Sequence, residues 1–328
     1  MALVHSVPGP PQGFYWDTIA DDNVPLKLLD CVPQDAALVT WSPFHPKPGW
    51  DWIKKTIAGA EFEPLSAGFN QWIMGLRGMG VDLDLWVESL GPGAGIVATV
   101  SQDQKWLLPL PDGGKLEIPQ MAVALVFEVK DDTIFPFVDA MLQPMPTVVR
   151  VDDGDLRLRS VPVPMPIPLN VKPTIARMGP YLILASNDDI VKAMDSCRHG
   201  ENPSIRTTEE FQLLAKGLPT EAMGCSFLSR RLGSTVAAIT QGSMAANPEA
   251  KPVAVLMAAL QREQSSYGVS LRMPDGIVGI SRTDFDLGEA LVIQAAVMPV
   301  ALVAGMTLPA LTQARGKARS ISDLNNLK

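Results

Sequence analysis

The sequence predicts an α+β fold of duplicated antiparallel sheet-plus-helix units, followed by one long C-terminal hydrophobic helix. The expected strands lead into hairpins and then into helices, rather than alternating strictly with helices as in a parallel sheet. The pattern apolar-Pro-x-acid-Ala, followed by a short strand, occurs at residues 32–36 and again at 218–222. An uncharged apolar run extends from Ala290 to Leu311.

The amino-acid composition excludes several classes of protein. The chain has 328 residues, of which 47% are hydrophobic, and this argues against a disordered protein. Its formal net charge of −8 argues against a general nucleic-acid binder, which needs Lys and Arg to neutralise phosphates. The three cysteines include no Cys-x-x-Cys pair, so they provide neither a disulfide framework nor a cysteine-based zinc site.

Four segments are expected along the chain. Residues 1–24 are rich in Pro, Gly and Asp and are predicted to form an irregular lead-in. Residues 25–205 are the first α+β unit, with a proline-rich hairpin, and residues 206–285 are the second. Residues 286–328 are predicted to form a transmembrane helix and a basic tail.

In the first part of the chain, apolar runs predict strands, and apolar residues at helical spacing predict helices. The expected strands are Ala37 to Trp41, Gly95 to Val100 and Met121 to Val129, and the expected helices are Trp50 to Ala60, Leu65 to Met79 and Ile134 to Leu142. Met121 to Val129 is mostly Val, Ala, Leu and Phe, which suits a central strand. Leu90 to Gly93 is expected to be a turn, and Asp131 to Thr133 an N-cap.

The middle of the chain predicts two hairpins. Asp152 to Asp155 separates the expected strands Val148 to Val151 and Leu156 to Val161, and Gly179-Pro180 separates Ile175 to Arg177 from Tyr181 to Ala185. Between the hairpins, the alternate prolines of 161–168 exclude a central strand and favour a rigid connection over a partner ligand. Asn187 to Asp189 then caps a helix from Ile190 to Cys197.

The second unit repeats the order of the first. A short strand, 223–229, follows the second copy of the proline motif. Two helices are expected next, Leu232 to Ser243 and Pro252 to Gln264, and then the strands Tyr267 to Met273 and Gly276 to Arg282.

The residues predict no catalytic, cofactor-binding or metal-binding site. Gly91 to Gly95 precedes a strand and lacks the Gly-Lys-Ser/Thr of a phosphate loop. Ser229, before Arg230 and Arg231, is interpreted as a strand-end cap. The remaining candidates are three scattered histidines, His5, His45 and His199, and three cysteines interpreted as small buried hydrophobes, Cys31, Cys197 and Cys225.

Two patterns leave alternatives open. Asp152, Asp153 and Asp155 could share a calcium ion, although a solvated hairpin tip is favoured. The first third of the chain is rich in tryptophan and includes Trp41, Trp50, Trp52, Trp72, Trp86 and Trp106. Core packing is expected for most of them, and an exposed subset near Phe44-His45-Pro46 would form a partner surface.

The apolar run Ala290 to Leu311 predicts a membrane span. As a helix it would be about 33 Å long, against a hydrocarbon core of about 30 Å. Arg315, Lys317 and Arg319 follow it, and basic residues beside a span favour the cytoplasmic side. The alternative is a helix buried in a soluble domain. The first 18 residues have no signal-peptide pattern, so either the true start lies upstream or the domain stays in the cytoplasm.

A resemblance covers the last tenth of the chain. Leu308 to Leu311 (LPAL), the two Ala-Arg pairs at 314–315 and 318–319, and Asn325 to Lys328 (NNLK) resemble the N-terminal helix of pilin-like and pseudopilin G-like proteins of planctomycete and verrucomicrobial type. The resemblance implies that a globular pilin-like domain follows such a helix. The region upstream is loosely similar to envelope-associated bacterial domains of unknown function.

We therefore expect a non-enzymatic, membrane-anchored cell-envelope protein linked to a pilin-like or secretion-type assembly. It would cross the inner membrane once, with its large domain in the periplasm. The expected partners are membrane lipid and other pilin-like helices or a second copy, with no nucleic acid and no cofactor. The alternative is a soluble ligand-binding or enzymatic α+β domain whose C-terminal helix packs on its own core.

Overall fold

The computed structural model describes residues 2–8, 22–59, 63–109, 115–163, 171–235, 264–274 and 276–284. Ala2–Thr283 forms one compact unit, and Met1 with Asp284–Lys328 is grouped apart from it. The predicted helices Leu232 to Ser243 and Pro252 to Gln264 fall mostly outside the described residues, as do the prolines of 164–168 and the whole of 286–328. Within the described residues, no helix is both long enough and apolar enough to cross a membrane.

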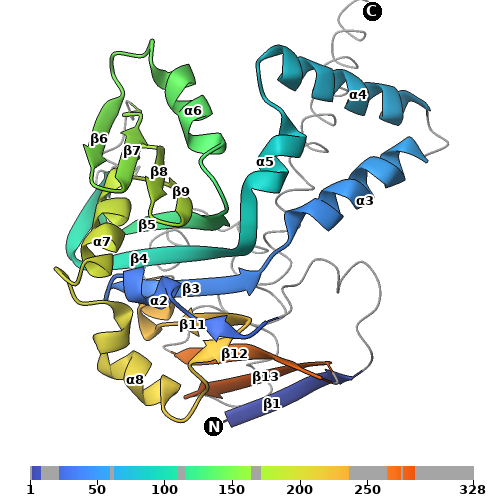
Figure 1. Cartoon of the computed structure of the whole chain (residues 1–328). Coiled ribbons are helices and arrows are strands. Elements are labelled where there is room, and N and C mark those ends of the chain that lie inside the picture. Colours follow the sequence, from blue (N-terminus) through green and yellow to red (C-terminus); the bar gives the residue numbers. More distant parts are fainter. Residues whose placement is uncertain are drawn as a thin grey trace, which may run out of the picture. The chain divides into compact units, whose positions relative to one another are not determined.

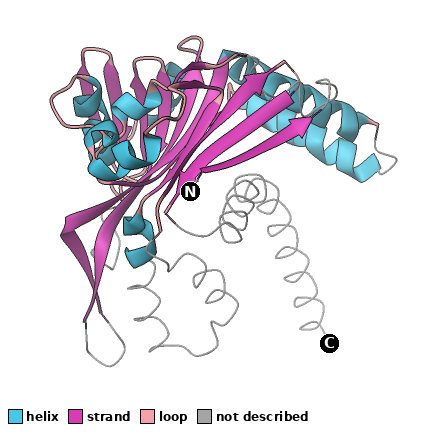
Figure 2. Ribbon diagram, turned by 90° about the horizontal axis from the view of Figure 1, so that it is seen from below, coloured by secondary structure: helices cyan, strands magenta, loops and turns pink. Residues whose placement is uncertain are grey.

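The compact unit is α+β, as predicted, and is built on a large antiparallel sheet (Figures 1 and 2). Eleven of the described strands form this sheet in the order β1-β13-β12-β11-β3-β4-β5-β9-β8-β7-β6. They are β1 Ala2–Pro8, β3 Ala36–Pro43, β4 Leu90–Pro109, β5 Lys115–Val129, β6 Val149–Asp153, β7 Leu156–Ser160, β8 Thr174–Met178, β9 Tyr181–Ala185, β11 Gly224–Leu228, β12 Ser266–Met273 and β13 Gly276–Thr283. A small second sheet pairs β2 Val24–Pro25 with β10 Glu221–Ala222.

Helices lie on both faces of the main sheet. They are α2 Leu28–Cys31, α3 Pro46–Ala58, α4 Glu63–Gly78, α5 Leu83–Ser89, α6 Ile134–Leu142, α7 Asp188–Arg198, η1 Ile205–Thr207 and α8 Glu209–Ala215. The main core lies between one face and the helices α2, α7 and α8, with Val39, Val126, Ile183 and Phe227 almost inaccessible to solvent. A smaller core beneath α6, around Phe135 and Leu182, covers the outer end of the other face.

Several predicted elements are confirmed. The helix Ile134–Leu142 has the predicted bounds, and Met121 to Val129 lies in β5, between β4 and β9. Both predicted hairpins are present, and their turns contain Gly154 and Gly179 at positive φ, a conformation that costs glycine little. The side-chain oxygen of Asn187 caps α7 by accepting from the backbone N–H of Ile190.

Two expectations are wrong. Ala2–Pro8, expected in an irregular lead-in, is an edge strand paired with β13, a partner far away in sequence that supplies the hydrogen bonds. Leu90 to Gly93, expected as a turn, belongs to β4, with a shift of register between Leu90 and Ala94. Gly93 is required there by close approach, because an added Cβ would lie 2.0 Å from Cζ2 of Trp41.

The central part of the sheet has a symmetric order. β3 and β11 are antiparallel neighbours, with Thr40 opposite Ser226. Going outward, β3 is followed by β4, β5 and β9, and β11 by β12, β13 and β1. A local two-fold axis at the Thr40–Ser226 pair relates Trp41 to Phe227. Aligning the two proline motifs, 32–36 and 218–222, gives that same correspondence.

Candidate functional site

The connection between β3 and β4 forms a helical arm, which we define as α3, α4 and α5. Figure 1 shows α3 and α4 extending away from the sheet and α5 leading back into β4. Proline at the first position of α3 suits a helix start, because its missing N–H has no partner in the first turn. No residue of α3 is buried, although Trp50, Ile53 and Ile57 recur at helical spacing. The arm is therefore an amphipathic structure with little contact to the core.

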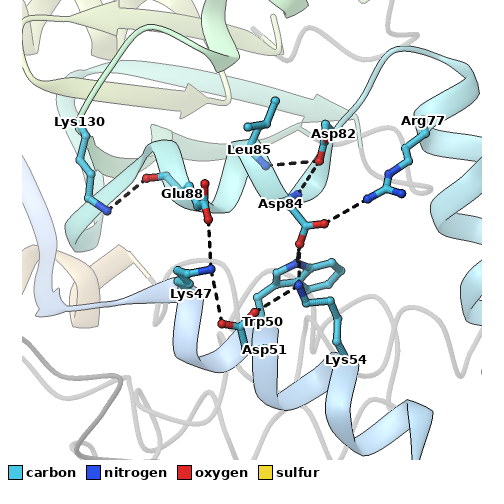
Figure 3. A network of polar contacts seen from close by, with 10 residues as sticks. All are labelled: Lys47, Trp50, Asp51, Lys54, Arg77, Asp82, Asp84, Leu85, Glu88 and Lys130. Carbon is cyan, nitrogen blue, oxygen red and sulfur yellow. Dashed lines mark hydrogen bonds and ion pairs between the residues drawn. The ribbon is translucent and has the colours of Figure 1, made fainter.

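Asp84, in α5, holds the three helices of the arm together (Figure 3). Its carboxylate accepts hydrogen bonds from Trp50 Nε1 at 2.7 Å, from Lys54 Nζ at 2.7 Å and from Arg77 Nη2 at 3.2 Å. Lys54, followed by Trp50, lowers the pKa of this carboxyl group below its usual value. An ionised carboxylate with three donors is suited to bracing α3 and α4 against α5, and not to proton transfer near neutral pH.

A second set of charges closes the base of the arm (Figure 3). Lys47 lies 3.1 Å from Glu88 and 3.6 Å from Asp51, and Asp51 also lies 3.2 Å from Lys54. Hydrogen bonding to Glu88, together with the charge of Asp51, raises the pKa of Lys47. Lys130, just after β5, donates to the backbone oxygen of Glu88 at 3.2 Å. The charges of the arm are thus paired largely with one another.

A hollow of about 300 Å³ lies between the helices of the arm. Its walls combine apolar groups, among them Ile57, Phe69 and Ile73, with the polar groups of the Asp84 network. Phe69 contacts both Trp50 and Trp72, with ring centroids 5.9 Å and 5.8 Å apart. Aromatic side chains therefore tie α3 to α4.

The arm exposes large apolar side chains. Trp52 is 47% exposed, Trp72 51% and Met74 65%, and Met79, just after α4, is 60% exposed. Trp52 and Trp72 are therefore an exposed subset of the tryptophans, whereas Trp41 is buried in the main core. Exposed aromatic and methionine side chains gathered on one projecting element are typical of a contact surface.

The structure separates the three aspartates of the predicted hairpin tip. Asp152 pairs with Arg159 at 2.8 Å, whereas Asp155 pairs with Arg198. The calcium alternative is therefore disfavoured, because each of these two carboxylates already holds a cation. Asp155 does lie near Asp195 and His199, within 4.8 Å between ligand atoms, but Arg198 pairs with both aspartates.

Ser229 and the three cysteines have structural roles in the described residues. Ser229 is buried, donates to Glu210 Oε2 at 2.7 Å and accepts from the backbone N–H of Arg231, which confirms the predicted cap. The three cysteines are buried and unpaired, as predicted. Burial raises the pKa of the Cys31 and Cys225 thiols to about 12, so neither is a thiolate at neutral pH.

Sequence reasoning missed the Asp84 network. Its members come from three helices and are separated by up to thirty-four positions, so no local motif marks them. The only signal was the group of tryptophans together with Phe44-His45-Pro46. Comparisons of the chain with protein-family models, with curated proteins and with solved structures found no match.

Proposed function

We propose that this chain is a non-enzymatic, membrane-anchored cell-envelope protein that presents its helical arm to a protein partner. The observation that carries the proposal is the arm itself, which exposes Trp52 and Trp72 while its charges pair internally. Such a surface is suited to binding, because tryptophan dominates the energetics of many protein interfaces. The Asp84 carboxylate, held ionised by its donors, supports a bracing role over a catalytic one.

Anchoring rests on the sequence from Ala290 to Leu311, which has no charge and is long enough to span a bilayer. Arg315, Lys317 and Arg319 favour a cytoplasmic C-terminal tail and hence a periplasmic sheet domain across the inner membrane. The resemblance of 308–328 to pilin-like helices supports a link to a pilin-like or secretion-type assembly, with the helix associating laterally with similar helices.

The sheet domain is proposed to have arisen by duplication. One unit contributes β1, α2, β3, the arm, β4 and β5, and the other contributes β9, α7, α8, β11, β12 and β13. The support is the symmetric strand order and the shared register at the Thr40–Ser226 pair. Each unit gives its first strand to the other, since β1 pairs with β13 and β9 with β5.

One observation favours the alternative of a soluble domain whose C-terminal helix packs on its own core. On the face of the sheet opposite α7, Val123, Leu125 and Leu184 are 43%, 39% and 41% exposed. Leu125 and Leu184 are paired on adjacent strands, so this is a continuous apolar strip that an apolar helix could cover.

Membrane fractionation of the full chain distinguishes a membrane-anchored protein from a soluble domain. The wild-type chain is expected in a carbonate-resistant pellet, and Val297→Arg with Leu302→Arg is expected to release it. Each arginine costs about 2.5–3.5 kcal/mol at the centre of a span. The matched control carries Leu213→Arg and Met273→Arg, at exposed positions of the sheet domain, and should remain in the pellet. A soluble wild-type chain would exclude the anchor.

A further inference from the structure

We propose that two copies of this chain associate by pairing their β6 strands edge to edge, which joins the two large sheets into one. β6 is the last strand of the sheet, and among the described residues no strand pairs with its outer side (Figure 1). Four of its five residues are exposed. An unpaired edge of this kind presents a row of backbone N–H and C=O groups to which another strand can bind.

The turn after β6 determines which backbone groups point outward. Gly154-Asp155 is a two-residue turn with a positive φ at the glycine alone, which is typical of a type II′ hairpin. Such a turn is closed by a hydrogen-bonded pair, here Asp153 and Leu156, and bonding alternates along each strand of an antiparallel ladder. The N–H and C=O groups of Asp152 and Arg150 therefore point away from β7, towards an added strand.

The two outward-bonding residues match each other across a two-fold axis. With the axis through Val151, Arg150 of one copy lies opposite Asp152 of the other, and the same pair recurs on the far side of the axis. Each pair exchanges two backbone hydrogen bonds and places opposite charges side by side. Asp152, which already holds Arg159 of its own copy at 2.8 Å, then lies between two guanidinium groups. Charges on an edge hinder pairing with unrelated strands, so this match favours a second copy.

Exposed methionines lie beside the same edge. Arg150 Nη2 donates to the backbone oxygen of Leu142 at 2.6 Å, and this contact holds the end of α6 against β6. Met141 and Met145, on either side of Leu142 in the sequence, are 55% and 39% exposed. A two-fold axis perpendicular to the sheet leaves α6 of both copies on one face of the joined sheet. The methionines are thereby brought towards their counterparts, and their flexible side chains suit such a contact.

Cysteine cross-linking within β6 of the full chain tests the pairing and its register. Val151→Cys places the two thiols on the axis, in a non-hydrogen-bonded pair whose Cα atoms lie about 4.5 Å apart, close enough for a disulfide. Val149→Cys is the matched control on the same strand, because its two copies would lie about 14 Å apart. Val149 is 44% exposed and Val151 is less exposed, so random collisions would favour the control.

Under mild oxidation Val151→Cys should form a disulfide-linked dimer, and Val149→Cys should remain a monomer. The native cysteines are buried and give a low background. Equal cross-linking at the two positions, or none at Val151→Cys, overturns the proposal.

Sedimentation of the purified full chain in a mild detergent, over a concentration series, measures the strength of the contact. Arg150→Glu places like charges opposite each other twice and should weaken dimerisation at least tenfold. Lys216→Glu, the same change of charge at an exposed position after α8, should leave dimerisation unchanged. Far-ultraviolet circular dichroism verifies that both variants keep their fold. A wild-type chain that is monomeric throughout, or equal effects of the two variants, overturns the proposal.

This contact uses neither the arm nor the proposed membrane anchor, so it fails or stands separately from the proposed function. A membrane-bound monomer would overturn the β6 pairing alone, and a soluble dimer linked through Val151→Cys would overturn the anchor alone.

Discussion

Arg159 is a buried cation whose surroundings explain why a charge is stable there. Its side chain is 5% exposed and donates to both carboxylate oxygens of Asp139, in α6, and to Asp152, in β6. It also donates to the backbone oxygens of Val151 and Leu158. Arg159 lies in β7, so these contacts attach α6 to the two outermost strands at this edge of the sheet, β7 and β6.

Replacing Arg159 should destabilise the sheet domain. Arg159→Leu leaves the 32% exposed carboxylate of Asp139 without its cation, and we expect a loss of about 2 kcal/mol. Lys105→Leu is the control, because the Lys105–Glu117 pair is more than half exposed on both sides and should contribute less than about 1 kcal/mol. Urea denaturation measures both, and equal losses would contradict the assigned role of Arg159.

The Arg159–Asp139 pair should also make the free energy of unfolding depend on pH in acidic solution. Hydrogen bonding to Arg159 lowers the pKa of Asp139 below its usual value of 3.8. The stabilisation is therefore fully present above pH 3.8 and is lost as the pH falls through the lower pKa of the folded state. The difference in unfolding free energy between wild type and Arg159→Leu should shrink below that pH. A constant difference between pH 6 and pH 2.5 would contradict the assignment.

At the scale of elements, the space around two glycines shows that the central strands are tightly packed and that α4 of the arm is not. Gly95, in β4, faces the backbone of β3, and an added Cβ would lie 2.1 Å from the carbonyl oxygen of Thr40. Gly75, in α4, has nothing within 4 Å of the same added atom. The two glycines therefore have opposite consequences for stability, although both lie inside regular secondary structure.

Alanine at these two positions tests the difference. Gly95→Ala should lower the unfolding free energy by about 3 kcal/mol, because the backbone of β3 must move. Gly75→Ala should stabilise α4 by about 0.5–1 kcal/mol, because alanine favours the helix. Urea denaturation reports the first change, and slower amide hydrogen exchange in α4 reports the second. A neutral Gly95→Ala would mean that β3 and β4 are less closely packed than described.

The arm should also unfold locally more easily than the sheet. Asp84→Asn removes the charge that Lys54 and Arg77 share, and all three side chains are at least 39% exposed. We expect less than about 1 kcal/mol of local destabilisation and faster amide exchange confined to α3 and α4. Faster exchange in β3 or β11 as well would show that the network supports the sheet and not the arm alone.

For the whole molecule, the proposed duplication predicts that the two halves of the sheet unfold together, because each half pairs an outer strand with the other. Each half has its sheet completed by the other, through the β1–β13 and β5–β9 pairs, and β3 pairs with β11 at the centre. During a urea titration, the amides of β4–β5 and those of β12–β13 should lose protection at the same midpoint. Midpoints more than about 1 M apart would show that the halves are independent domains.

Several local sequence patterns led to correct predictions, although the local turn pattern at Leu90 to Gly93 did not. The strand Ala37 to Trp41 and the helix Ile134 to Leu142 were identified from their apolar spacing and capping residues alone. The edge strand Ala2–Pro8 was not, because its partner, β13, lies at the other end of the compact unit. Amphipathic spacing in the arm predicted the helices, but it could not reveal that Trp52 and Trp72 are about half exposed.

The two ends of the compact unit leave the sheet at one corner, since Ala2 lies opposite Arg282 in the β1–β13 pair. Tension applied between these ends loads the two strands from the same side, and their hydrogen bonds then break one after another instead of all at once. A force applied between Ala2 and Thr283 therefore separates this strand pair from its open end. It would peel β13 away from β1 while β3, β4 and β11 carry no load.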